Sequence, residues 1–349
     1  MTVLYAEVPH FYAEFERSSD PALADRPVVV GGDPRKRGLV QSATADALAV
    51  GVEVGMPVLE ALQRCHGVAR RTNMRAYREA SSRLRACFRT ATTRVEPAGL
   101  EAAYLDPAGG SRGSDDLAHE LQAQVRASLR LPLRVGIAPV KFLARLAAED
   151  AGLSGVRRID GSEMRAFLAP LPVARLPGVG PNTEAALAEL GLVTVGDLVG
   201  TSAVTIEERL GNHGLTILTA AQGQGESRVR ASPHPRSLSQ EVTLDRGEVD
   251  LGVLGEQLVG LAGHLEASLR LEHLVAQRVV LKVRYLDGET ITRSCTLTHA
   301  VFESTELHPL ARQLLARTQA GERPVRLIGL GVGRLARLRV DERQLPLFE

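Results

Sequence analysis

The sequence predicts an α/β (α+β) protein, and three observations support this fold class. Up to about residue 165, short apolar runs alternate with helical patterns, as in a mixed α/β domain. A Gly-x-Gly turn that opens a helix, at 176–192, is typical of a helix-hairpin-helix. Beyond residue 237, the order of strand and helix patterns is βαββαβ. The chain is therefore expected to contain more than one domain.

Composition sets broad limits on function. The 349 residues are 44% hydrophobic and 24% charged, with a net charge of +1, which is ordinary for a soluble globular protein. The overall charge gives no electrostatic reason to expect nucleic-acid binding, so local patches must supply one. Nearly all the basic residues are Arg. This usage suits bidentate phosphate contacts, and it is equally explained by genomic base composition.

Targeting and redox features are absent from the sequence. Three widely spaced cysteines without CxxC spacing predict neither a disulfide framework nor a zinc site. The N-terminus reaches acidic residues too early for a signal peptide. No run of about 18 apolar residues exists that could span a membrane. We expect a cytoplasmic protein with no membrane association.

The first domain begins with a buried strand that ends in a single carboxylate, Glu7, followed at once by Pro9. GGDPRKRG forms a basic, turn-rich loop after the second strand. Apolar periodicity predicts the following elements in chain order: strand 3–7, helix 10–17, strand 27–31, a helical region at 41–63, helix 74–94, strand 99–106, helix 114–129, strand 133–138 and helix 141–151.

The segment LPGVGPNTEAALAELGLVTVGDLVG predicts a helix-hairpin-helix. Its Gly-x-Gly turn opens a helix that Gly191 closes as a C-cap, and a short second helix follows. The amides of Gly178, Val179 and Gly180 lie at a helix N-terminus, where backbone N–H groups bind phosphate. The alternative is an ordinary tight turn.

The C-terminal domain is predicted from a strand at 238–244, helix 250–271, a hairpin, helix 304–319 and a strand at 325–339. Asp287–Gly288 is a strong hairpin turn. Apolar residues alternate with basic ones along the first hairpin strand, so one sheet face is expected to be core and the other basic. That basic face either follows a phosphate backbone or is merely solvated. The candidate DNA-binding residues are Arg236, Arg278, Lys282, Arg284, Arg334 and Arg337.

This order of parts resembles the Y-family translesion DNA polymerases over about residues 1–340. The resemblance rests on FYAEFE, RPVVVGG, GVEVGMPVLEAL, AYREASSRLRA, VEPAGLEAAYLD, VGIAPVKFLARLAAE and LPGVGPNTEAALAELGL. It implies a right-hand architecture with the following parts: a palm at 1–165 with interleaved fingers at about 20–75, a thumb with the helix-hairpin-helix at 166–230, a linker at 231–236, a little finger at 237–340 and a tail at 341–349.

The family's chemistry needs carboxylates on neighbouring strand ends, so that paired Mg²⁺ ions about 3.5–4 Å apart can bridge the nucleophile and the triphosphate. The resemblance implies an Asp-x-Asp pair and an Asp-Glu pair. The matching residues are Glu7-Val8-Pro9 and Glu101-Ala102. One ligand is thus lost at Ala102, and two others are Glu, one methylene longer than Asp. Because misplacing reacting groups by about 1 Å can cost on the order of a hundredfold, we expect these to be vestigial positions.

The family's triphosphate ligands are also replaced. Where the family carries a Tyr and an Arg in the fingers, this chain has Ala45 and Leu48, and Gly152 stands where a family Lys is expected. Tyr12 remains at the position that screens the sugar 2′ position, although its ring could equally serve as core. Lys141 matches a retained lysine. We therefore expect no required cofactor, with Mg²⁺ bound only if the site is active.

The C-terminal sequence ERQLPLFE resembles the bacterial sliding-clamp-binding peptide. Leu345, Leu347 and Phe348 would anchor in an apolar pocket, and Gln344 would fix the orientation. A final strand docked on its own sheet is the alternative, which Pro346 disfavours.

The resemblance is closest to the catalytically inactive ImuB-type subfamily. It implies a non-catalytic homologue in SOS-type mutagenesis that binds primer–template DNA and the clamp, with an error-prone replicative-type polymerase and a RecA-like accessory protein as further partners. ImuB-type proteins usually carry a longer tail than this one. The first alternative is an active low-fidelity polymerase whose altered Mg²⁺ site uses Glu7 and Glu101; Asp106 is a further candidate, but its spacing from Glu101 predicts that its side chain faces elsewhere. The second is a DNA-binding clamp regulator without a polymerase partner.

Overall fold

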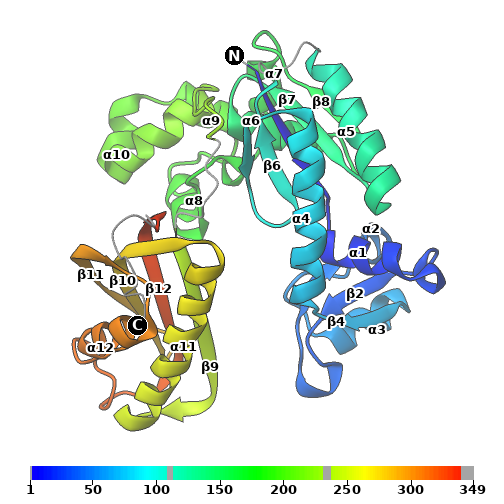
Figure 1. The fold of residues 1–349 in the computed structure, drawn as a ribbon. Helices are drawn as coiled ribbons and strands as arrows, with labels where there is room; N and C mark the ends of the chain where they lie inside the picture. The colour runs from blue at the N-terminus through cyan, green and yellow to red at the C-terminus, as the bar shows by residue number, and fades with distance from the viewer. Residues whose placement is uncertain (1, 108–112, 231–236, 339–349) are drawn as a thin grey trace, which may run out of the picture. The chain divides into compact units, whose positions relative to one another are not determined.

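The computed structural model describes residues 2–107, 113–230 and 237–338. The chain divides into two compact units, with the boundary between residues 231 and 232. The first unit contains a five-stranded and a three-stranded sheet, and the second contains a four-stranded sheet (Figure 1). In the described part of the chain, no helix is both long and apolar enough to cross a membrane.

A mixed five-stranded sheet organises the first unit. Its strands, in spatial order, are β5 (Val95–Pro97), β6 (Ala102–Leu105), β1 (Val3–Glu7), β7 (Arg134–Ala138) and β8 (Val156–Arg158). The central strand β1 pairs antiparallel with both neighbours. Strand β5 and strand β8 were not predicted, because three residues are too few for a periodic pattern.

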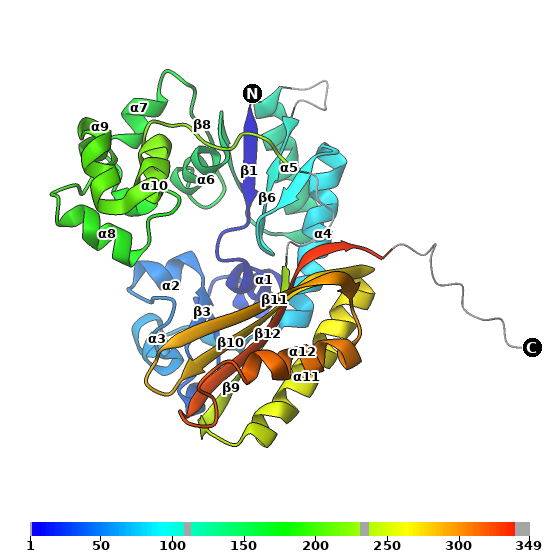
Figure 2. The ribbon, with the colours of Figure 1, turned by 90° about the vertical axis from the view of Figure 1, so that its left-hand side faces the viewer.

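Both faces of this sheet are buried. Val3 and Tyr5 point into a core that contains α6 (Lys141–Asp150), whereas Leu4 and Ala6 point into the core under α4 (Met74–Ala91) and α5 (Ser114–Leu129). Figure 2 shows α6 on one side of β1 and the other two helices on the opposite side. Helix α6 approaches β7 closely because Gly136 has no side chain: a Cβ there would lie 1.9 Å from the Ala144 carbonyl oxygen.

A second, three-stranded sheet lies in the segment expected to form the fingers. Its order is β3 (Val40–Ala43), β2 (Val28–Gly31) and β4 (Val68–Arg71), with helices α1 (Phe11–Ser19), α2 (Ala45–Ala49) and α3 (Val58–Cys65) nearby in sequence. The prediction of helix from residue 41 onward was wrong at its start. Residues 40–43 pair with β2, and all of them are buried except Gln41, which is exposed.

The remaining helices of the first unit include the predicted helix-hairpin-helix. They are α7 (Met164–Leu168), α8 (Pro181–Ala188), α9 (Val195–Gly200) and α10 (Ala203–Ala221), with a 3₁₀ turn at Val173–Arg175. A capping box between Thr194 and Asp197 starts α9. Leu187, Leu198 and Ile206 share one core with α6, which fixes these helices against it.

The second unit has the predicted βαββαβ order. Its elements are β9 (Ser237–Glu248), α11 (Leu251–Leu271), β10 (Leu274–Tyr285), β11 (Thr290–Val301), α12 (Ser304–Leu315) and β12 (Val325–Arg337). The sheet is antiparallel in the order β11-β10-β12-β9, and α11 and α12 pack on one face of it. The hairpin turn is confirmed, with Gly288 at φ 96°.

Candidate functional site

The ends of strands β1, β6 and β7 bring the predicted active-site positions together. Glu7 is the last residue of β1 and lies directly opposite Ala102 of β6 and Arg134 of β7. Directly opposite residues in an antiparallel pair share one sheet face. The Val8 amide donates to the Glu101 carbonyl at 3.0 Å, which continues the pairing beyond the strand. We refer to Glu7, Glu101, Ala102 and Arg134 as the strand-end site.

Arg134 forms an ion pair with Glu7 inside this site. Both its Nε and one terminal nitrogen donate to the same carboxylate oxygen, Oε2, at 2.9 and 2.7 Å. The two side chains are only 17% and 16% exposed, so solvent screens the pair weakly. The side chain of Glu101, by contrast, makes no hydrogen bond or ion pair with any residue that the structure describes.

The electrostatics of Glu7 show why it needs a cation. Burial raises the pKa of the Glu7 carboxyl above its ordinary value, and the negative charges of Glu149 and Glu101 add to the rise. The charge of Arg134 and its hydrogen bonds oppose the rise. Arg134 therefore favours the ionised form of Glu7, and burial, the larger effect, opposes it.

The paired Mg²⁺ ions that the family resemblance implies do not fit this set of residues. Ala102 offers a methyl group where an oxygen ligand would be needed, and it is 2% exposed. Among the described residues, no group of three or more His, Cys, Asp or Glu side chains could hold a metal ion. Arg134 adds a positive charge beside the one carboxylate that β1 contributes, which further opposes cation binding.

The expected nucleotide-binding positions lie in apolar or turn surroundings. Tyr12 is half-buried and its ring stacks on Tyr77, with centroids 4.4 Å apart. Leu48 packs against the core of the three-stranded sheet, and Ala45 is the first residue of α2. Gly152 lies in the turn after α6 with φ 74°. None of these side chains except Tyr12 carries a group that hydrogen-bonds a phosphate.

Lys141 is buried at the start of α6. Its Nζ lies 2.7 Å from a Glu96 carboxylate oxygen and 3.3 Å from one of Glu226. The same oxygen of Glu96 accepts a hydrogen bond from the Arg230 amide at 2.6 Å. Lys141 therefore ties the segment around 226–230 to the five-stranded sheet, which is a structural role.

The helix-hairpin-helix turn leaves two amides available. Gly178 has φ 89°, and its carbonyl lies 3.0 Å from His213 Nε2. The Val179 amide donates within the turn to the Leu176 carbonyl at 3.3 Å. The Gly178 and Gly180 amides donate to no group in the described chain. They are the two donors that remain for a phosphate.

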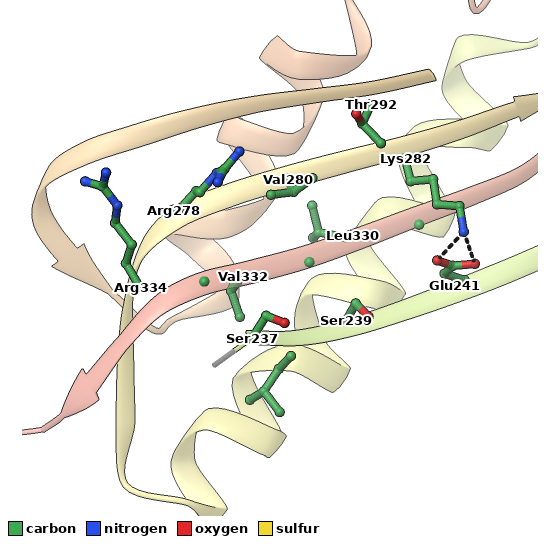
Figure 3. A pocket seen from close by; sticks show the side chains of 14 residues that line it. Ser237, Ser239, Glu241, Arg278, Val280, Lys282, Thr292, Leu330, Val332 and Arg334 are labelled. Atoms are coloured by element: carbon green, nitrogen blue, oxygen red, sulfur yellow. Dashed lines mark hydrogen bonds and ion pairs between the residues drawn. The ribbon is translucent and has the colours of Figure 1, made fainter. Parts of the chain in front are cut away.

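The open face of the second unit carries a furrow along β12. Gly329, Gly331 and Gly333 alternate on this strand, so the middle of the face has no side chains, whereas Leu330 and Val332 point into the core. Register places Arg278, Val280 and Lys282 of β10 along one side, and Ser237, Ser239 and Glu241 of β9 along the other. Figure 3 shows these walls, with β12 between them.

The basic side chains on this face differ in whether a carboxylate neutralises their charge. Lys282 reaches across Gly329 to Glu241, with Nζ–O distances of 2.9 and 3.1 Å, so its charge is compensated. Arg278 and Arg284 make hydrogen bonds only to hydroxyls in the described chain, and both are exposed. Exposed Arg334 stands at the Arg278 end of the furrow, and Arg337 is exposed near the end of β12.

Several predicted residues fall outside the described chain. They are Arg236 in the expected linker and the clamp-binding residues Gln344, Leu345, Leu347 and Phe348.

Comparison with known proteins identifies the family. A family model described as "impB/mucB/samB family" matches residues 7–149, and the model of its C-terminal domain matches residues 235–347. A protein of Halorhodospira halophila named DNA polymerase IV is 34% identical over 350 residues, covering 99% of this chain and 98% of that protein. The chain belongs to the Y-family of DNA polymerases.

Other Y-family proteins are similar to this chain over nearly its whole length. A DNA polymerase IV of Alkalilimnicola ehrlichii is 34% identical over 351 residues, covering 99% of both chains. The fold is that of a solved Y-family DNA polymerase chimera (TM-score 0.82, 23% identity, covering 97% of this chain and all of that one). An insertion ternary complex of Dbh DNA polymerase has a TM-score of 0.75 at 22% identity, again covering 97% of this chain and all of that one.

Two features of this chain were not predicted from the sequence, namely the ion pair of Arg134 and the furrow along β12. Arg134 begins an otherwise apolar strand, RVGIA, and such an isolated charge at a strand end was a usable signal. The alternation G-L-G-V-G at 329–333 has period two, which places all three glycines on one sheet face.

Proposed function

We propose that this Y-family member is a non-catalytic homologue that acts in translesion DNA synthesis. In this proposal it binds primer–template DNA and the sliding clamp, and it bridges them to an error-prone polymerase during SOS-type mutagenesis. The observation that carries the proposal is the strand-end site, where Ala102 supplies no ligand and Glu7 is bound to Arg134. Removing one ligand and neutralising another leaves no basis for two-metal phosphoryl transfer.

DNA binding is supported by surfaces away from the strand-end site. The furrow of the second unit presents exposed Arg278 and Arg334, and Arg284 is exposed further along β10; these side chains suit contacts with a phosphate backbone. The free amides of Gly178 and Gly180 suit a phosphate at the start of α8. These features act on the DNA backbone and so predict binding without sequence preference.

A second candidate, an active low-fidelity translesion polymerase, is favoured by the name of the relatives, DNA polymerase IV, at 34% identity. Primer extension on an undamaged template, with Mg²⁺ and then Mn²⁺, separates the two functions. The control is the double variant Glu7→Ala, Glu101→Ala. Extension that disappears in this variant would establish the active polymerase. Absence of extension together with retained primer–template binding agrees with the non-catalytic role.

Clamp binding and bridging are tested separately. The double variant Leu347→Ala, Phe348→Ala removes two of the three expected apolar anchors of the tail, and we expect it to abolish binding to the bacterial sliding clamp in a surface-binding assay. Its primer–template affinity should stay unchanged. Co-purification of an error-prone polymerase with the wild-type chain would support bridging, whereas a clamp complex without any polymerase would favour a clamp regulator.

A further inference from the structure

The strand-end site contains a cation that belongs to the protein. Arg134 and Glu7 are register partners on β7 and β1, and the guanidinium donates twice to Glu7 Oε2, at 2.9 and 2.7 Å. The pair does not rely on one flexible surface contact. Both residues end or begin a strand of the central sheet, and the sequence neighbours Val8 and Val135 are fully buried. The position of the guanidinium is therefore set by the sheet.

The charges around Glu7 would be unbalanced without Arg134. Of the two other nearby carboxylates, Glu149 is already paired with Arg145 and Arg175. Glu101 has no partner in the described chain. A partly buried carboxylate next to an unpaired one needs a positive charge close by. In an acidic strand-end site, a divalent cation can supply that charge.

We propose that Arg134 is the resident cation of the strand-end site and takes the place of a divalent metal. Its guanidinium balances Glu7 permanently, so the first unit holds this carboxylate in place without Mg²⁺. Unlike a metal ion, a guanidinium has no open coordination position and cannot activate a bound oxygen. This inference concerns the same site as the proposed function, but its test does not depend on polymerase activity.

The test is rescue of an Arg134 variant by a divalent cation. Arg134→Gln keeps much of the side-chain volume but removes the charge, and we expect the Tm of the full chain to fall by about 5–10 °C because Glu7 loses its partner. Millimolar Mn²⁺ should restore much of this loss, and Mn²⁺ electron paramagnetic resonance should show an ion bound to the variant that wild-type protein does not bind. Arg134→Ala provides a second, smaller replacement.

The matched control is Arg134→Gln combined with Glu7→Gln. Without the carboxylate there is no charge to balance, so the double variant should recover stability in metal-free buffer and lose the Mn²⁺ response. Equal Mn²⁺ stabilisation of wild-type protein and Arg134→Gln would overturn the inference. So would an Arg134→Gln protein that is destabilised but indifferent to Mn²⁺. Primer extension by wild-type protein would contradict the proposed function, but it would not decide whether Arg134 takes the place of a divalent metal.

Discussion

The basic residues at one end of the furrow in the second unit lead us to a quantitative prediction about DNA binding. Arg278 and Arg334 lie at the same end of the furrow (Figure 3), and neither makes an ion pair in the described chain. Each is therefore free to neutralise one phosphate and release its counterions. The perturbation is the double variant Arg278→Gln, Arg334→Gln. Gln keeps a long polar side chain, and at position 334, where φ is 51°, it adds no new β-branching.

The magnitude follows from counterion release. Two lost phosphate contacts at about 0.9 each lower the slope of log K against log salt concentration by about 1.8. If the electrostatic contribution vanishes near 1 M salt, the same slope predicts an affinity loss of about sixty-fold at 0.1 M salt. The assay is fluorescence anisotropy of a labelled primer–template duplex, measured over a series of salt concentrations.

The control uses the compensated cation on the same face. Lys282→Gln combined with Glu241→Gln removes one positive and one negative charge from the pair that crosses Gly329. Because the net charge of the furrow is unchanged, the salt slope should stay near that of the wild type. An unchanged slope in the Arg278, Arg334 variant would refute the argument, and so would an equal change in the control.

Three further predictions concern single positions. Gly331→Val should weaken duplex binding in the same assay without unfolding the second unit, because the new side chain fills the floor of the furrow, where an added Cβ would lie 3.3 Å from the Ser239 Cβ. Lys141→Ala should lower the free energy of unfolding by about 2 kcal/mol, a value reduced because the partner carboxylates are partly exposed, and it should lower the Tm by about 4–8 °C. The control is Arg75→Ala, which should have little effect because the ion pair of Arg75 is exposed. The hydrogen bond from Arg323 holds the pKa of Asp287 below its ordinary value, so this pair stabilises the fold at neutral pH and the stabilisation is lost as the pH falls through that lowered pKa. Carboxyl NMR titration should show the pKa of Asp287 rising in Arg323→Gln, and an unmoved titration would contradict the assignment.

Much of the fold could be predicted because its elements are long and periodic. Helices α5 and α11 were placed to within a residue, since each keeps an apolar stripe over four or more turns. Short elements were harder. The sequence pattern does not predict strand β3, because four residues of mixed polarity, VQSA, carry no decisive period, and pairing with β2 decides their conformation.

The candidate site was predicted in part. The departures from the family motifs at Ala102, Ala45 and Leu48 could be found along the sequence, since each is a local substitution in a recognisable motif. The structural role of buried Lys141 could not be predicted from the sequence, because its partners Glu96 and Glu226 come from distant segments.

The sequence alone determined that this chain is a Y-family protein with altered metal positions, because motifs and periodicity are local properties. Only the tertiary structure decided that Glu7 is paired with Arg134. Glu7 and Arg134 are 127 residues apart, and nothing in either segment indicates the other. The register of β1 against β7 brings them together, and register depends on how the whole sheet buries its two faces. In the second unit, the register of β12 against β10 and β9 makes the three alternating glycines of β12 the floor of a furrow with basic residues along its β10 wall.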